Sequence, residues 1–242
     1  ELRLLTTLQQ KKEILSGLGV DNVEVLDFTR GFSSMTVEEY LREIVIGKFG
    51  GTAVLLGYDN RIGSDAKDTD HVARIAERMG LEVIRADMIS SQTGVAVSST
   101  KIRERLSSGD VTSAAEMLGY RYTLHGVVIA GNRLGRTIGF PTANMQLYEP
   151  LKLIPGNGVY FVRVRTVGRE LYGMCNIGYR PTVSSGNART IETNIFGFDE
   201  DIYGLDIRIS FLSKIRDEVR FESLEKLKIQ LENDRDACLD LM

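Results

Sequence analysis

The segment whose residue types most clearly suit ligand binding is Gly135-Arg136-Thr137-Ile138-Gly139-Phe140-Pro141-Thr142-Ala143-Asn144. Its glycines allow the backbone to approach a ligand closely, and Pro141 stiffens the turn and removes a backbone donor. Thr142 then offers a hydroxyl and Asn144 a carbonyl oxygen, both of which suit a hard cation such as Mg²⁺. The segment is no P-loop, because it lacks Gly-Lys-Ser/Thr. A tight turn between two strands is the alternative interpretation.

A second chemical candidate is Glu192, in the alternating run at 190–196. Side chains of a strand point to opposite faces in turn, so Ile191 and Ile195 share one face and Glu192 lies on the other. A carboxylate there can orient a hydroxyl or accept its proton. The alternative is a carboxylate that is merely solvated on the outside of a strand.

Two further polar segments accompany these, namely Asn176-Ile177-Gly178-Tyr179-Arg180-Pro181-Thr182 and Phe198-Asp199-Glu200-Asp201-Ile202-Tyr203-Gly204. Together with 135–144 and Thr190-Ile191-Glu192-Thr193-Asn194-Ile195-Phe196, and in this order, they resemble riboflavin kinase. The resemblance covers essentially the whole chain. Upstream, Val97-Ser98-Ser99-Thr100-Lys101-Ile102-Arg103 resembles the second signature of the FMN adenylyltransferase module. Bacterial bifunctional FAD synthetases carry that module ahead of riboflavin kinase.

The resemblance implies an ATP-dependent phosphorylation of riboflavin to FMN, with ADP as the second product. It implies that Glu192 is the catalytic carboxylate and that Thr142 and Asn144 hold Mg²⁺. The residues that would bind ATP and its phosphates in the kinase are Gly131, Gly135, Arg136, Gly139, Pro141, Thr142 and Asn144.

For the adenylyltransferase, the resemblance implies that Ser99, Thr100 and Arg103 contact the phosphates of ATP, and that Asp59 lies at the nucleotide site. Free N–H groups at a helix start, hydroxyls and an arginine form an anion site. The alternatives are a capped helix with solvated cations and, around Asp59, a plain strand-to-loop turn.

The family's early glycine-rich strand end and its His-x-Gly-His-like motif do not occur in this sequence, which opens at Glu1 inside a helical pattern. We therefore expect an amino-terminally incomplete adenylyltransferase. Adenylylation of FMN to FAD, with release of pyrophosphate, is expected only if the working protein has a leading segment that carries the motif.

The first half of the sequence alternates helix and strand signals. Strands are predicted at 23–28, 52–57 and 81–84, with helices at about 36–48 and 70–79 between them. Such alternation is typical of a parallel sheet covered by helices. The pattern predicts a Rossmann-like α/β nucleotidyltransferase domain over residues 1–119, which ends with helices from Ser98 and over 111–118.

The second half changes to short strands separated by Gly, Asn and Asp turns. The predicted strands are 124–130, 158–164, 171–177, 190–196 and 207–211. Evenly spaced strands without helices between them are typical of a closed antiparallel barrel. A final helix from Ser223 would pack Leu224, Leu227 and Leu231 against it. Residues 120–242 are therefore predicted to form a riboflavin kinase β-barrel domain with a C-terminal helix.

Composition limits the partners. The net charge of −3 gives no basic field for nucleic acid, and no apolar run is long enough to cross a membrane. Cys175 and Cys238 lack metal-ligand spacing and read as thiols of a reducing cytosol, so we expect a cytoplasmic protein. A homo-oligomer is compatible with the sequence. A non-catalytic flavin- or nucleotide-binding regulatory module is the alternative function.

Overall fold

The computed structural model describes residues 3–57, 61–88, 96–131, 134–180 and 188–242. The chain divides into two compact units. One comprises residues 14–97, and the other comprises residues 1–13 together with 98–242. The division expected at 119/120 stays a prediction.

The unit of residues 14–97 contains the predicted parallel pair of strands. Strand β1 (Ala53–Leu56) pairs with β2 (Glu82–Arg85) so that Ala53 lies opposite Glu82 and Leu56 opposite Arg85. The helices of this unit are α2 (Arg30–Ser34), α3 (Val37–Glu39), the π-helix η1 (Tyr40–Lys48) and α4 (Thr69–Arg78).

Helix caps and an apolar core explain these elements. Thr36 and Glu39 form a reciprocal capping box at the start of α3, and the Asp68 carboxylate accepts the His71 N–H at the start of α4. The core of the unit consists of Val37, Leu41, Leu56, Val72, Ala73, Ile75, Ala76 and Leu81. The helix predicted over 36–48 is therefore present, although most of it is π-helical.

The strand predicted at 23–28 is wrong, because the backbone there is irregular. Val25 is 54% and Phe28 80% exposed, so their side chains do not pack in a core. Alternating apolar residues form a strand only where a neighbouring strand accepts their hydrogen bonds, and the sheet of this unit pairs β1 with β2 alone among the described residues.

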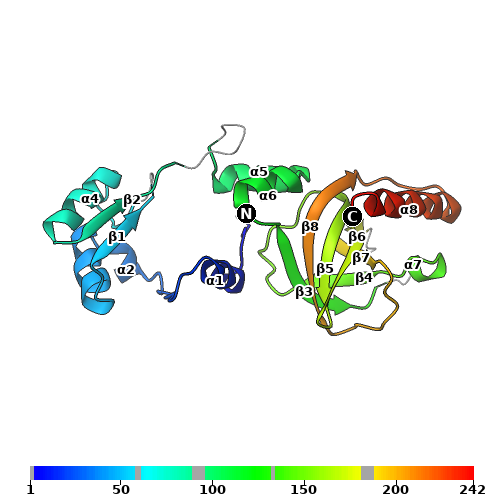
Figure 1. Cartoon of the computed structure of the whole chain (residues 1–242), viewed down its shortest axis with the longest axis horizontal. Coiled ribbons are helices and arrows are strands. Elements are labelled where there is room, and N and C mark those ends of the chain that lie inside the picture. Colours follow the sequence, from blue (N-terminus) through cyan, green and yellow to red (C-terminus); the bar gives the residue numbers. More distant parts are fainter. Residues whose placement is uncertain (1–2, 58–60, 89–95, 132–133, 181–187) are drawn as a thin grey trace. The chain divides into compact units, whose positions relative to one another are not determined.

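The second unit contains a closed six-stranded antiparallel barrel (Figure 1). Its strands follow one another around the barrel in the order β3-β4-β7-β6-β5-β8. Their bounds are Thr123–Ile129 (β3), Ala143–Leu147 (β4), Gly158–Thr166 (β5), Arg169–Arg180 (β6), Ala188–Ile195 (β7) and Asp206–Arg216 (β8). The predicted barrel is confirmed, but β4 was not predicted, because it starts two residues after Pro141 in a segment that resembles a turn.

The barrel interior is apolar and well packed. The Tyr160 and Phe211 rings meet edge to face with their centres 5.2 Å apart, and both side chains are fully buried. The other buried interior side chains include Leu124, Val128, Val162, Val164, Ile177, Ile191, Ile207 and Ile209.

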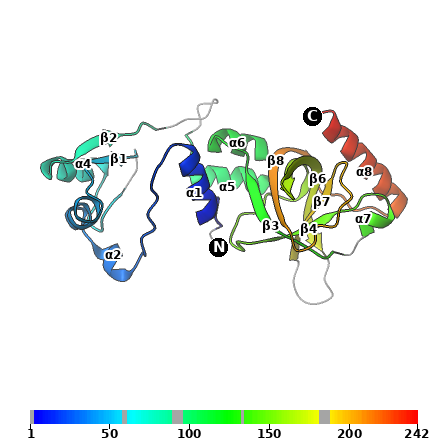
Figure 2. The same ribbon diagram turned by 60° about the horizontal axis from the view of Figure 1, so that its bottom comes forward.

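Four further helices belong to this unit, namely α5 (Ser99–Ser108), α6 (Val111–Leu118), α7 (Leu134–Thr137) and α8 (Leu224–Leu239). Ser98, Asp110 and Ser223 cap α5, α6 and α8 as the sequence predicts. Helix α8 packs against β6 and β8 (Figure 2). Leu224, expected to face the barrel, is 51% exposed.

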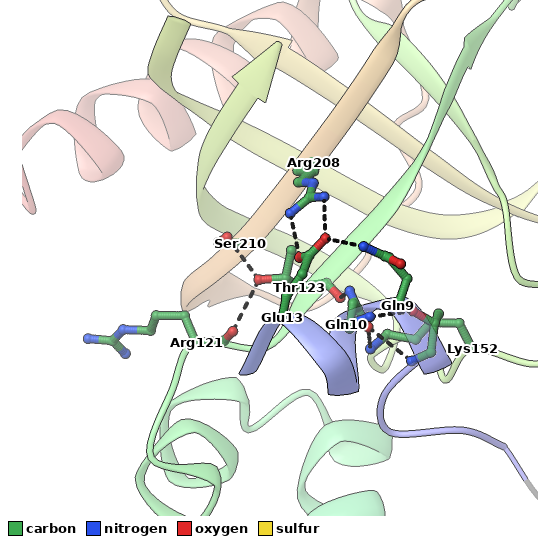
Figure 3. A network of polar contacts seen from close by, with 9 residues as sticks. Gln9, Gln10, Glu13, Arg121, Thr123, Lys152, Arg208 and Ser210 are labelled. Atoms are coloured by element: carbon green, nitrogen blue, oxygen red, sulfur yellow. Dashed lines mark hydrogen bonds and ion pairs between the residues drawn. The ribbon is translucent and has the colours of Figure 1, made fainter. Parts of the chain in front are cut away.

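Residues 4–13 lie against the barrel (Figure 3). The Leu4 backbone N–H donates to the Leu151 carbonyl over 2.8 Å, and the Leu4 carbonyl accepts from the Leu153 N–H over 2.9 Å. Helix α1 (Leu8–Gly17) begins just beyond, and both Glu13 oxygens accept from the Arg208 guanidinium at 2.9 and 3.1 Å. This segment is therefore held by main-chain pairing and by an ion pair.

Lys152 also takes part in this contact, beside Gln10 (Figure 3), and only 3% of it is exposed. Its ammonium group donates to the Leu5 carbonyl and, over 2.7 Å, to Gln10 Oε1. It also lies 4.3 Å from the centre of the Tyr122 ring. Burial lowers the pKa of Lys152 from 10.5 to about 7.

This burial makes the stability of the barrel unit depend on pH. Between pH 7 and 10.5 the unfolded state binds more protons at Lys152 than the folded state, so this lysine adds stability as the pH rises. The test compares the free energy of unfolding of the wild type with that of Lys152→Met. We expect this difference to rise in favour of the wild type by up to about 1.4 kcal/mol per pH unit from pH 7 to 9. Urea unfolding followed by tyrosine fluorescence measures this.

The matched control is Lys11→Met, which removes an exposed lysine of α1 and should leave a difference that is constant with pH. A constant difference for Lys152→Met as well would contradict the prediction.

Candidate active site

The seam between β4 and β7 brings the predicted site residues together. Ala143 pairs with Thr193 and Asn144 with Glu192. Residues directly opposite each other in a ladder point to the same face, so the side chains of Asn144 and Glu192 are neighbours. Thr193 lies on the other face and is fully buried. The alternation predicted from the sequence is therefore present in β7.

Glu192 faces a cavity of about 240 Å³, here named the apolar cavity. Most of its wall is apolar and comes from the barrel, from the segment after β8 and from α8. Its lining residues are Gly135, Ile138, Phe140, Thr142, Val159, Met174, Asn176, Glu192, Asn194, Arg216, Glu218, Val219, Phe221, Leu227 and Leu231.

A second cavity, of about 90 Å³, lies on the other side of Thr142 and is here named the small cavity. Its lining residues are Val128, Arg136, Pro141, Thr142, Ala143, Thr193, Ile195, Phe198, Asp199, Glu200, Asp201, Ile202 and Tyr203. Thr142 lines both cavities, so molecules bound in the two would meet at its side chain.

The glycines of the site are required by contacts within the chain. A Cβ on Gly131 would come within 2.3 Å of the Asn144 amide nitrogen, and one on Gly135 within 2.2 Å of the Phe140 carbonyl oxygen. Gly139 has a positive φ of 86°, which other residues rarely adopt. These close approaches are to the protein's own backbone and side chains, and the approach of the backbone to a ligand stays a prediction.

Asn194 fastens the segment that carries Thr142 to β7. Its Nδ2 donates to the Pro141 carbonyl over 2.7 Å, and the side chain is 8% exposed. The position of Asn194 two residues after Glu192 puts both side chains on the same face of the strand, but nothing in the sequence marks Asn194 for this contact.

The small cavity has a mixed electrostatic wall. Asp199, Glu200 and Asp201 line it together with Arg136. Two of the carboxylates are engaged elsewhere, since Glu200 pairs with Arg169 and Asp201 accepts the Tyr203 backbone N–H over 3.1 Å.

Cys175 packs behind the seam, opposite Thr193 in the ladder. Burial raises the pKa of its thiol to about 12, so it stays protonated at neutral pH.

The donor set suits a phosphate-bound Mg²⁺. Among the residues that the structure describes, no group of three His, Cys, Asp or Glu side chains could hold a metal ion. Thr142 and Asn144 instead provide a hydroxyl and an amide oxygen, both neutral oxygen ligands. Mg²⁺ commonly takes few protein ligands and completes its octahedron with substrate phosphates and water.

Those residues predicted for the adenylyltransferase that the structure describes do not lie with the predicted kinase residues around the two cavities. Asp59 lies outside the described residues, as do Pro181 and Thr182 of the kinase-like segment. Ser99 and Thr100 are the first residues of α5, and the Arg103 Nε donates to the Arg3 carbonyl over 2.9 Å. Neither Ser99, Thr100 nor Arg103 lines the apolar or the small cavity.

Comparisons with known proteins identify the family of the chain. The family model for riboflavin kinase matches residues 118–242, and that for FAD synthetase matches residues 1–101. The relative from Haemophilus influenzae, a bifunctional riboflavin kinase/FMN adenylyltransferase, is 34% identical over 231 residues, which are 95% of this chain and 74% of the relative. The chain belongs to the riboflavin kinase/FMN adenylyltransferase family.

Other members of this family are equally similar. The bifunctional riboflavin kinase/FMN adenylyltransferase of Listeria monocytogenes is 35% identical over 97% of this chain and 74% of its own length. That of Escherichia coli K12 is 35% identical over 95% of this chain and 73% of its own length.

A crystal structure from Streptococcus pneumoniae, described as a macrolide-efflux protein, has the same fold. It is 31% identical and has a TM-score of 0.89, over 97% of this chain and 75% of its own. Within the described ranges, no helix of the present chain is both long and apolar enough to span a membrane.

The link between Asn194 and Pro141 can be tested through stability. Asn194→Asp keeps the shape of the side chain but replaces the donor with a carboxylate that faces the Pro141 carbonyl. We expect the free energy of unfolding to fall by roughly 1–3 kcal/mol, because a partly buried carbonyl loses its donor. Gln146→Glu, the same change of amide to carboxylate at an exposed position of β4, should have almost no effect. Equal losses in the two variants in urea unfolding would refute the assignment.

Proposed function

We propose that this chain transfers the γ-phosphoryl group of ATP to riboflavin and so forms FMN, with the reaction at Thr142. The observation that supports this most is the arrangement of two cavities that share Thr142, with Glu192 facing the larger one and pairing with Asn144. The match of the riboflavin kinase family model over the same residues agrees with it.

In this proposal the apolar cavity receives the flavin. Its wall of Ile138, Phe140, Met174 and Leu231 suits a flat aromatic ring system, while Asn176 and Glu192 suit a polar ribityl chain. The small cavity and Arg136 receive part of the nucleotide. Gly131, Gly135, Gly139 and Pro141 shape the backbone around its phosphates.

The proposed reaction begins with the primary hydroxyl of riboflavin beside Glu192. The carboxylate orients this hydroxyl and accepts its proton while the oxygen bonds to the γ-phosphorus and the bond to the ADP oxygen breaks. The transition state of such a transfer is loose, so positioning of the hydroxyl contributes at least as much as removal of its proton.

Thr142 and Asn144 would hold the Mg²⁺, which would neutralise part of the charge of the phosphates. The close contact between Gly131 and Asn144 then keeps the amide oxygen in place. Thr142 and Asn144 are both uncharged, so the Mg²⁺ would bind together with the phosphates of the nucleotide.

We further propose that residues 1–119 form the FMN adenylyltransferase domain, with Asp59, Ser99, Thr100 and Arg103 at its nucleotide site, and that 120–242 form the kinase domain. The FAD synthetase family model, which matches 1–101, supports this second activity. Its product would be FAD, with release of pyrophosphate.

The kinase proposal is tested by product analysis after incubation with riboflavin, Mg²⁺ and excess ATP. The wild type should form FMN, and Glu192→Gln should be slower by at least about 10²-fold while it still binds riboflavin. Glu170→Gln changes an exposed carboxylate of β6 and serves as the control.

Riboflavin binding without FMN formation by the wild type would favour the non-catalytic binding module instead. An unchanged rate for Glu192→Gln would remove Glu192 from the role of base. FAD among the products would support the adenylyltransferase.

The Mg²⁺ assignment predicts a selective effect of Gly131→Ala. The added methyl group would displace the Asn144 amide, so the KM for Mg-ATP should rise roughly 10-fold or more, while the Kd for riboflavin stays unchanged. Gly17→Ala, at a position with no atom within 4 Å of the new Cβ, is the matched control. An unchanged KM for Mg-ATP over a range of Mg²⁺ concentrations would exclude this role of Asn144.

A further inference from the structure

One strong ion pair lies behind the apolar cavity, between the end of β8 and helix α8. The Arg216 Nε donates to both oxygens of Asp234 at 2.8 and 3.0 Å, and Nη2 donates to Oδ2 at 2.7 Å. The Asp234 side chain is 1% and the Arg216 side chain 19% exposed. A forked contact of this kind fixes the direction as well as the distance between its partners.

The same two side chains hold the segment between β8 and α8. Arg216 Nη1 donates to the Asp217 carbonyl over 2.9 Å, and the guanidinium lies 5.7 Å from the centre of the Phe221 ring. Gln230 Nε2 donates to Asp234 Oδ1 over 2.9 Å. The pair therefore joins three successive parts of the chain, namely the end of β8, the segment 217–222 and α8.

These three parts supply one side of the apolar cavity. Arg216 lines the cavity from β8, Val219 and Phe221 from the segment, and Leu227 and Leu231 from α8. Asp234 does not line the cavity itself. It contacts Arg216, which does, and so acts on the cavity wall through that side chain. Thr142 and Glu192 also line the cavity, but they come from other parts of the barrel, since Glu192 belongs to β7 and Thr142 directly precedes β4.

We propose that Asp234 is a positioning residue for the flavin, which sets the affinity for riboflavin without taking part in phosphoryl transfer. The inference rests on the proposed function, because it takes the apolar cavity as the flavin site. A flat ligand is bound by contacts over its whole face, so a small shift of α8 and of the 217–222 segment loosens many contacts at once.

Helix α8 also has an attachment that is independent of this pair. Cys238 and Leu231 pack with Phe140, Val159 and Met174 in an apolar cluster. Loss of the ion pair should therefore leave α8 on the barrel but in a less defined position. The neighbouring pair of Lys226 and Glu222 is exposed at both ends, and exposed pairs have little effect on structure.

Asp234→Asn tests the proposal, with Glu222→Gln as the control that changes an exposed carboxylate near the start of the same helix. Riboflavin binding is followed by the quenching of its fluorescence in the absence of ATP, and turnover by FMN formation. For Asp234→Asn we expect the Kd and the KM for riboflavin to rise roughly 10-fold or more. The KM for ATP and the kcat at saturating riboflavin should stay within about 3-fold of the wild type, since the seam is untouched.

An unchanged riboflavin Kd, or a fall in kcat with no change in the riboflavin KM, would overturn the proposal. If Asp234→Asn does not fold by circular dichroism, Gln230→Ala removes only the supporting donor and should raise the riboflavin Kd in the same direction by a smaller factor; no change there would also overturn it. Failure of the wild type to form FMN would refute the proposed function instead, and the binding titration is independent of that outcome.

Discussion

The register between β4 and β7 is the constraint on which the candidate site depends. Only the pairs Ala143–Thr193 and Asn144–Glu192 join the two strands, and the bond from Asn194 to the Pro141 carbonyl fixes the entry to β4. Because side chains alternate along a strand, a slip of one residue would turn Glu192 into the barrel and Thr193 out of it. The apolar residues Ile191 and Ile195 oppose such a slip, since both are buried inside the barrel. The core of the barrel thus determines which way Glu192 points.

Close packing of buried amides and glycines holds the residues around this seam. Asn144 and Asn194 are both 8% exposed, and Gly131 leaves just enough room for the Asn144 amide. Neutral amides can be buried at modest cost when they are hydrogen-bonded, whereas a buried charge needs a partner. The close contacts at Gly131 and Gly135 and the positive φ of Gly139 explain why three glycines occur within nine residues of the chain at 131–139.

The sequence predicted those helices whose first and last residues are marked by capping residues and glycines. Helix α6 occupies 111–118 as expected, because Asp110 caps its start and Gly119, with a φ of 78°, ends it. Strand β4 escaped prediction because a strand that follows Gly-Phe-Pro-Thr looks like a turn, and only its neighbours β3 and β7 make it a strand. The opposite error at 23–28 has the same cause, since alternation there finds no partner strand. Glu192, Thr142 and Asn144 could be named from their motif, but the sequence contains no signal for the register that brings them together.

The β4–β7 seam and helix α8 are attached to the barrel by different kinds of interaction. The β4–β7 seam is held by main-chain hydrogen bonds, which resist displacement because each broken bond leaves a buried polar group unpaired. Helix α8, in contrast, makes no main-chain ladder with the barrel and is attached by the Arg216–Asp234 pair and by apolar contacts. Apolar contacts alone tolerate small sliding movements, so the ion pair supplies the direction that they lack. Substitutions in α8 can therefore change the shape of the apolar cavity while Glu192 keeps its place. On the proposed function, such substitutions would change the affinity for the flavin independently of the chemistry.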